Sequence, residues 1–98
     1  MRESKYQAQL IEELYSIFRG CVILKNDPNY RQGMPDIMIL FGNRWAVLEV
    51  KASQNTPSQP NQEYYIELLN EMSFAAFIYP ENHEEVLIQL FEALAGVR

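Results

Sequence analysis

Hydrophobic residues recur along the chain at two spacings, one typical of helices and the other of strands. Three segments have the helical spacing, and they cover residues 2–19, 62–72 and 83–94. Four short apolar runs have the length of strands, and they cover residues 21–25, 36–41, 44–51 and 74–80. Gly42-Asn43 separates the second and third runs and is a two-residue turn signal, so these runs are predicted to form a β-hairpin. The predicted element order is α-β-β-β-α-β-α.

This order indicates one α/β domain that spans residues 1–98. The segment from Arg44 to Tyr79 is a strand-helix-strand unit, which normally makes its two strands parallel. We therefore expect a mixed four-stranded sheet, a three-stranded meander with a parallel fourth strand, covered by helices. The apolar faces of the three helices predict these buried residues: Tyr6, Leu10, Leu14, Ile17 and Phe18, then Tyr65, Leu68, Leu69 and Met72, then Val86, Leu87, Leu90, Phe91 and Leu94.

Charge and composition narrow the classes of function. The formal net charge is −5, which argues against a protein that coats nucleic acid through bulk positive charge. It does not exclude a nuclease, because a divalent metal can reverse the local sign of an acidic site. Cys21 is the single cysteine, so no internal disulfide forms, and its apolar surroundings predict a buried side chain. With no signal peptide and no apolar run near 18 residues, we expect a soluble cytoplasmic protein that does not enter a membrane.

Three charged residues lie in the predicted hairpin, where apolar side chains are the rule. Side chains alternate along a strand, so Glu49 and Lys51 point to the same face. A tight turn at Gly42-Asn43 places Asp36 directly opposite Glu49, with Cβ atoms about 4.5–5.5 Å apart. Two facing carboxylates repel each other, so a purely structural sheet would not favour them.

A divalent cation between the two carboxylates removes this repulsion. Magnesium prefers oxygen ligands and commonly takes one or two carboxylates, water and a substrate phosphate. The backbone carbonyl of Val50 is a further candidate ligand, and Lys51 is placed to position an attacking water or balance phosphate charge. The alternative is an ion pair between Lys51 and one carboxylate at the end of the sheet.

The residues Pro35-Asp36 and Glu49-Val50-Lys51 resemble the two halves of the PD-(D/E)XK nuclease motif. Within that superfamily the chain resembles the virus-type replication-repair nuclease (VRR-Nuc) family. The features similar to that family cover almost the whole chain, and they are Glu3 and Gln7, the G-x-P-D motif of residues 33–36, the E-V-K motif of residues 49–51, and Ser58 followed by Gln62. The loop after Lys51 departs from a basic DNA-contacting loop, because it is rich in glutamine, asparagine and serine.

The resemblance implies a restriction-endonuclease-like core and hydrolysis of DNA phosphodiester bonds with Mg²⁺ or Mn²⁺. Stand-alone phage members of the family resemble homodimeric Holliday-junction resolvases, which implies DNA repair on branched DNA by a homodimer. The residues carried over are Asp36 and Glu49 as metal ligands with the Val50 carbonyl, and Asp36, Glu49, Lys51 and Gln62 as catalytic residues. The alternative function is a DNA-binding or regulatory module that kept the fold and lost cutting.

Several further residues have both a functional and a structural interpretation. Glu3 is either a third metal carboxylate or an acid favoured at a helix start by the helix dipole. Gln62 either orients water or is an ordinary first-turn residue. His83 is interpreted as structural, because it lies outside the half of the chain that carries the motif. The residues expected to contact DNA are Lys25, Arg31, Gln32 and Arg44.

Overall fold

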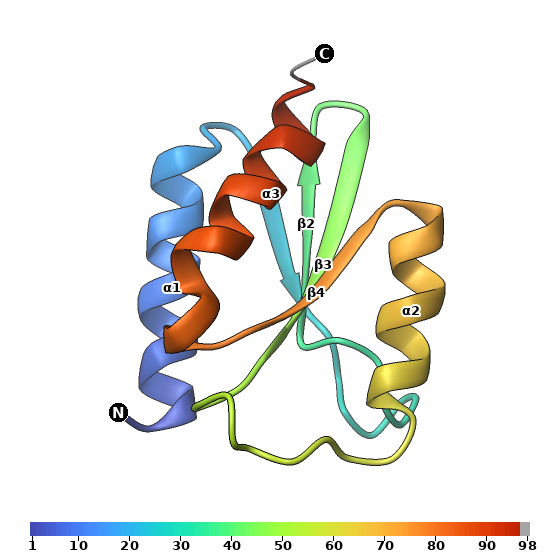
Figure 1. Cartoon of the computed structure of the whole chain (residues 1–98). Coiled ribbons are helices and arrows are strands. Elements are labelled where there is room, and N and C mark those ends of the chain that lie inside the picture. Colours follow the sequence, from blue (N-terminus) through green and yellow to red (C-terminus); the bar gives the residue numbers. More distant parts are fainter. Residues whose placement is uncertain (97–98) are drawn as a thin grey trace.

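The computed structural model describes residues 1–96 and contains the predicted elements in the predicted order (Figure 1). The helices are α1 (Glu3–Ile17), α2 (Gln62–Met72) and α3 (His83–Ala95), with a short 3-10 helix η1 (Pro80–Asn82) before α3. The strands are β1 (Val22–Lys25), β2 (Ile37–Phe41), β3 (Arg44–Val50) and β4 (Phe74–Ile78). The short helix η1 was not predicted.

The four strands form one mixed sheet in the order β1-β2-β3-β4, as predicted. The first three strands pair antiparallel, and β4 is parallel to β3. The β2–β3 register pairs Phe41 with Arg44 and Ile37 with Leu48. Gly42 makes the turn possible with a φ of +61°, a conformation that glycine adopts without steric cost. The turn therefore sets the register in which Asp36 and Glu49 meet.

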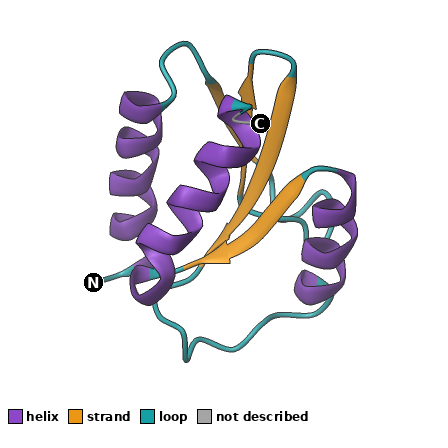
Figure 2. Cartoon of the chain, turned by 45° about the horizontal axis from the view of Figure 1, so that its top comes forward, coloured by secondary structure: helices purple, strands orange, loops and turns teal. Residues whose placement is uncertain are grey.

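The helices cover both faces of the sheet, two on one face and one on the other (Figures 1 and 2). Helices α1 and α3 lie side by side on one face, and α2 lies on the other (Figures 1 and 2). The face toward α1 and α3 carries the core, in which Leu14, Leu48 and Ile78 are fully buried. Helix α2 packs on β3 and β4. The same face of β1 and β2 is more open, so Leu24 is 47% exposed there.

The predicted core is buried on α1 and α3 in the main, but no residue of α2 is buried, and Tyr65, Leu68 and Leu69 are half-buried. Three further residues of the predicted set are exposed. Ile17 is 38% exposed, Met72 is 63% exposed and Phe91 is 45% exposed. Ile17 and Met72 are the last residues of their helices. Phe91 lies at the edge of the apolar stripe, where its ring contacts Phe18 at a centroid distance of 6.0 Å. Cys21 is buried, as expected.

The described part of the chain contains no helix with the length and apolar character needed to cross a membrane.

Candidate active site

Two carboxylates meet at the end of the β2–β3 hairpin. Asp36 directly precedes Ile37, which pairs with Leu48 of β3, so extending this register by one residue places Asp36 opposite Glu49. The backbone N–H of Val50 donates a hydrogen bond of 2.8 Å to Oδ2 of Asp36. Glu49 is only 3% exposed. The predicted cross-strand placement is thus confirmed, and the backbone of β3 fixes the orientation of Asp36.

The electrostatic surroundings of Glu49 disfavour its charged form. Burial is the largest cause, and the nearby Asp36 adds both charge repulsion and a hydrogen bond that the protonated form makes; Lys51 opposes these effects. Together they raise the pKa of Glu49 to about 8. Neighbouring carboxyl groups in a poorly solvated site share a proton for this reason. The pair consequently favours holding a proton near neutral pH, and a cation in its place would relieve the same repulsion.

Lys51 is held beside Glu49 through the side chain of Gln62. The ammonium of Lys51 is buried and donates to Oε1 of Gln62 at 2.7 Å and to the Pro57 carbonyl at 3.3 Å. The amide of Gln62 in turn donates to Oε2 of Glu49 at 3.0 Å. Within residues 1–96 the one ion pair joins His83 to Glu13. The interpretation of Lys51 as the partner of a direct carboxylate ion pair is therefore wrong.

The loop before Asp36 packs directly against the start of α2. Gly33 has a φ of +93°, and a Cβ atom on it would lie 2.6 Å from Cβ of Asn61 and 2.9 Å from the Pro60 carbonyl oxygen. Only glycine fits so close an approach. Pro35 is fully buried, and its ring fixes the backbone immediately before Asp36. These contacts explain why Asp36 and Gln62, which are far apart in sequence, belong to one site.

The donor set fits a hard divalent cation. Oε1 of Glu49 is buried and has no hydrogen-bond partner, which is costly for an ionised carboxylate. Both acids offer the oxygen ligands that Mg²⁺ or Mn²⁺ takes. No group of three or more His, Cys, Asp or Glu is arranged for metal binding in residues 1–96. The ligands supplied by the chain would therefore be Asp36, Glu49 and the Val50 carbonyl, with water and phosphate to complete the shell.

Glu3 lies near the carboxylate pair but forms no three-residue metal-binding group with it in residues 1–96. It lies at the start of α1 and is exposed. Partial burial is the main cause that raises its pKa, followed by the charge of Asp36, so it lies within electrostatic reach of the site. This position adds negative potential near Asp36. The expectation of a metal ligand at Glu3 receives no support from the geometry of the described residues.

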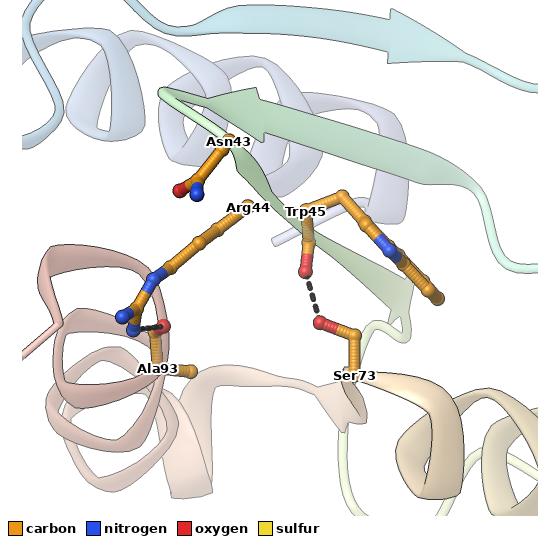
Figure 3. Close-up of a pocket in the computed structure, with 5 residues that line it drawn as sticks. All are labelled: Asn43, Arg44, Trp45, Ser73 and Ala93. Atoms are coloured by element: carbon orange, nitrogen blue, oxygen red, sulfur yellow. Dashed lines mark hydrogen bonds between the residues drawn. The ribbon is translucent and has the colours of Figure 1, made fainter.

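The four residues expected to contact DNA separate into two groups. Lys25, Arg31 and Gln32 are exposed at the end of the sheet that carries Asp36. Arg44 begins β3 at the opposite end, about 17 Å along the strand from Glu49 at about 3.3 Å per residue. Its guanidinium donates to the Ala93 carbonyl at 3.0 Å (Figure 3). Arg44 thus ties β3 to α3 and lies apart from the other three residues expected to contact DNA.

Some contacts of the site leave no signal in the sequence. The Pro57 carbonyl binds Lys51, and the backbone N–H of Gln59 donates to Oε1 of Gln62 at 2.8 Å. Both contacts depend on the backbone path of the loop, which residue types alone do not reveal. Ser58 instead donates to Glu63 at 3.4 Å, outside the carboxylate pair.

His83 joins α1 to α3 away from the carboxylates. Its Nδ1 lies 2.7 Å from the Tyr6 hydroxyl, and its Nε2 lies 2.8 Å from Oε1 of Glu13. Burial is the first cause that raises the pKa of Tyr6 to about 12, with the charges of Glu13 and Glu81 adding to it. The contacts agree with the structural role predicted for His83. The spacing of Tyr6 and Glu13 along α1, two helical turns apart, is the signal that indicates a shared face.

Comparison with known proteins supports the fold. No protein-family model matches the sequence, and no curated protein matches it. A solved structure described as "VRR_NUC domain" superposes with a TM-score of 0.61 and 24% sequence identity, over 79% of this chain and 82% of that chain. The chain therefore has the α/β fold of a VRR_NUC domain, as the motifs implied. At this identity the likeness is one of fold, and the chemistry depends on the residues described above.

Proposed function

We propose that this protein is a metal-dependent nuclease that hydrolyses phosphodiester bonds in DNA. The observation that carries the proposal is the buried, unpartnered oxygen of Glu49 beside Asp36, with Lys51 held one hydrogen-bonded side chain away. Two such acids side by side do not stabilise a sheet, because their charged forms are costly to bury and repel each other. The VRR_NUC fold of the solved relative adds independent support, because its name denotes a nuclease domain.

Each residue of the candidate active site has a defined task in this proposal. Asp36 and Glu49 would hold Mg²⁺ or Mn²⁺, together with the Val50 carbonyl. When bound, the cation supplies Lewis-acid activation and neutralises phosphate charge. Lys51 orients the attacking water and stabilises negative charge that develops on the phosphate. Gln62 fixes the Lys51 ammonium and one oxygen of Glu49, so that both stay in place as substrate arrives.

The preferred substrate in this proposal is branched DNA, cut by a homodimer as in Holliday-junction resolution. One domain of 98 residues offers one such carboxylate pair, so it cuts one strand at a time. Symmetric cutting of a four-way junction needs two sites related by a two-fold axis, and two-fold homodimers are the commonest oligomers. With a net charge of −5, binding through two sites on one substrate also compensates for weak affinity at each.

A cleavage assay on matched substrates tests this function. Linear duplex, flap and four-way-junction DNA of the same sequence are incubated with Mg²⁺, with Mn²⁺ and with EDTA. The proposal predicts paired nicks in the junction, slow cutting of linear duplex and no cutting in EDTA. Equal rates on all three DNAs would refute the branched preference. DNA binding without cutting under every metal condition would instead favour the binding module. Light scattering on the same sample checks the dimer, which a monomeric mass with junction DNA would refute.

Metal binding can also be measured without catalysis. At a Mg²⁺ concentration about ten times its Kd, mass action should raise the free energy of unfolding by about 1.4 kcal/mol. Urea denaturation of wild type with and without Mg²⁺ measures this increase. Glu49→Gln should abolish it, whereas Glu12→Gln, on the exposed face of α1, should retain it. An equal increase in wild type and Glu49→Gln would place the metal elsewhere.

A further inference from the structure

A mainly apolar hollow of about 440 Å³ lies at the end of β1, beside the loop that leads to Asp36. Its apolar walls come from Leu24, Tyr30 and Met34, and its polar lining residues are Lys25, Asn26, Asp27 and Arg31. This volume is within the range of small-ligand sites. Neither the carboxylate pair nor its hydrogen bonds with Lys51 and Gln62 use any of these residues.

The hollow is directly connected to the candidate active site. The backbone N–H of Asn26 donates to the Asp36 carbonyl at 2.8 Å, and the side chain of Asn26 donates to the Pro35 carbonyl at 2.6 Å. Leu24 pairs with Met38, two residues after Asp36, so strand alternation puts Leu24 and the Asp36 carboxylate on one face of the sheet. An extended ligand bound at the carboxylates can therefore reach the hollow along the same face of the sheet.

Tyr30 is placed to offer its ring to a ligand. It is 85% exposed, although it belongs to an ordered turn in which its N–H donates to the Asp27 carbonyl at 3.1 Å. An exposed ring gains free energy when a flat partner stacks on it. Next to it, Arg31 donates to the Tyr65 hydroxyl at 3.5 Å and is thereby directed along the surface between the loop and α2.

The charges around the hollow favour a ligand that combines an apolar ring with an anion. Lys25 and Arg31 supply two cations against one acid, Asp27. Oδ1 of Asp27 already accepts a hydrogen bond of 2.9 Å from the backbone N–H of Asn29. A nucleotide has the matching chemistry, because its base has an apolar face and its phosphate pairs with Lys or Arg. In duplex DNA the base faces are covered by stacking, so the base that fits must be unpaired.

We infer that this hollow takes an unpaired nucleobase of the DNA strand whose phosphate lies at Asp36 and Glu49, with Tyr30 as the stacking platform. The inference rests on the proposed function for its substrate, DNA, and assigns the recognition of unpaired strands to particular residues. Tyr30 contributes to substrate choice and takes no part in the chemical step.

Binding measurements in EDTA test the inference apart from cleavage. The probes are a fluorescein-labelled duplex with a single-stranded extension, the same extension with abasic positions, and a fully paired duplex. Base stacking on an aromatic side chain predicts that Tyr30→Ala weakens binding of the extended DNA by about 5- to 150-fold. Affinity for paired duplex should stay within about twofold. Tyr30→Phe should keep the wild-type affinity, and Tyr15→Ala, an exposed tyrosine on α1, serves as the matched control.

The abasic probe identifies the base itself as the ligand. Wild type should lose affinity for the DNA with one critical abasic position, whereas Tyr30→Ala should bind intact and abasic DNA equally. The inference would be overturned if Tyr30→Ala lost affinity equally for extended and paired DNA, or if it lost affinity for neither. A change of molar mass in Tyr30→Ala, measured by light scattering, would assign the hollow to a subunit interface and also overturn it.

The two proposals fail in distinguishable ways. Equal affinity of wild type and Tyr30→Ala for the extended DNA, together with metal-dependent cleavage by wild type, would refute the base site and leave the nuclease standing. Tyr30-dependent binding of extended DNA without cleavage in Mg²⁺ or Mn²⁺ would refute the nuclease and leave the base site standing. Failure of wild type to bind extended DNA overturns the inference regardless of cleavage.

Discussion

The side-chain amide of Gln62 donates a hydrogen bond of 3.0 Å to Oε2 of Glu49, and so joins the first residue of α2 to the end of β3. Oε1 of the same side chain accepts a hydrogen bond of 2.7 Å from the Lys51 ammonium. One amide therefore sets the position of both a candidate metal ligand and the candidate catalytic ammonium. Because Lys51 makes no direct ion pair in the described structure, the arrangement of the site depends on Gln62.

Replacement of Gln62 should loosen the site at a cost in stability. Gln62→Ala removes one hydrogen bond each from the buried groups of Lys51 and Glu49. A buried group that loses its partner costs about 1–3 kcal/mol. We expect a lower free energy of unfolding in urea and slower cleavage at saturating DNA. Gln89→Ala, on the exposed face of α3, is the control and should change neither quantity. Wild-type cleavage by Gln62→Ala would show that the amide does not position the site.

Lys51 should be needed for the chemical step more than for binding. Lys51→Ala removes the ammonium that would orient water and balance phosphate charge, so single-turnover cleavage should slow at least about 100-fold. Affinity for Mg²⁺, measured by titration calorimetry, should change by a few-fold only. Lys5→Ala, at an exposed position of α1, is the matched control. Proportional losses of metal affinity and cleavage would instead indicate a structural role.

Gly33 should tolerate no side chain. Gly33→Ala would carry both the strain of a φ of +93° and an overlap with Asn61 and Pro60. Gly20→Ala is a close control, since Gly20 has a φ of +88° but no atom within 4 Å of the point where its added methyl carbon would lie. Backbone strain of this kind costs about 1–3 kcal/mol. In urea denaturation Gly33→Ala should lose clearly more free energy of unfolding than Gly20→Ala. Equal losses would show that the loop moves aside freely.

Metal-free protein should become less stable as pH rises through neutrality. The pKa of Glu49 is about 8 in the folded protein, against an ordinary value of 4.5. Between these values the folded state binds a proton that the unfolded state has released, so the free energy of unfolding falls with increasing pH. Thermal unfolding in EDTA should give a lower Tm at pH 8.5 than at pH 5.5. Glu49→Gln should flatten this dependence, and a Tm that rises with pH in wild type would contradict the assignment.

The carboxylate pair could be predicted because local rules determine it. The Gly42-Asn43 turn sets the hairpin register, and strand alternation then places Asp36 opposite Glu49 without reference to the rest of the fold. The element order followed equally from periodicity and turn residues. The role of Gln62 was predicted only from the resemblance to a family motif. The structure adds its hydrogen bonds with Lys51 and Glu49, which explain why a glutamine stands there.

Other features depend on tertiary packing, which the spacing of residue types does not encode. In the sequence Arg44 resembles any free basic residue, yet the proximity of α3 gives it the Ala93 carbonyl as a partner. Met72 belongs to an apolar stripe, but α2 covers only part of the sheet and leaves it exposed. The hollow beside Tyr30 forms because the loop of residues 26–36 folds back on β1, a path that its prolines and asparagines permit but do not specify.

The central claim is that Asp36 and Glu49 together hold the cation needed to hydrolyse DNA. The most direct test is the single-turnover cleavage rate of four-way-junction DNA across a Mn²⁺ titration, for wild type, Asp36→Asn, Glu49→Gln and the control Glu12→Gln. We predict metal-dependent cleavage by wild type and Glu12→Gln, and no cleavage by the other two variants, both folded by circular dichroism. Cleavage by wild type in EDTA, or at the wild-type rate by either Asp36→Asn or Glu49→Gln, would contradict the claim.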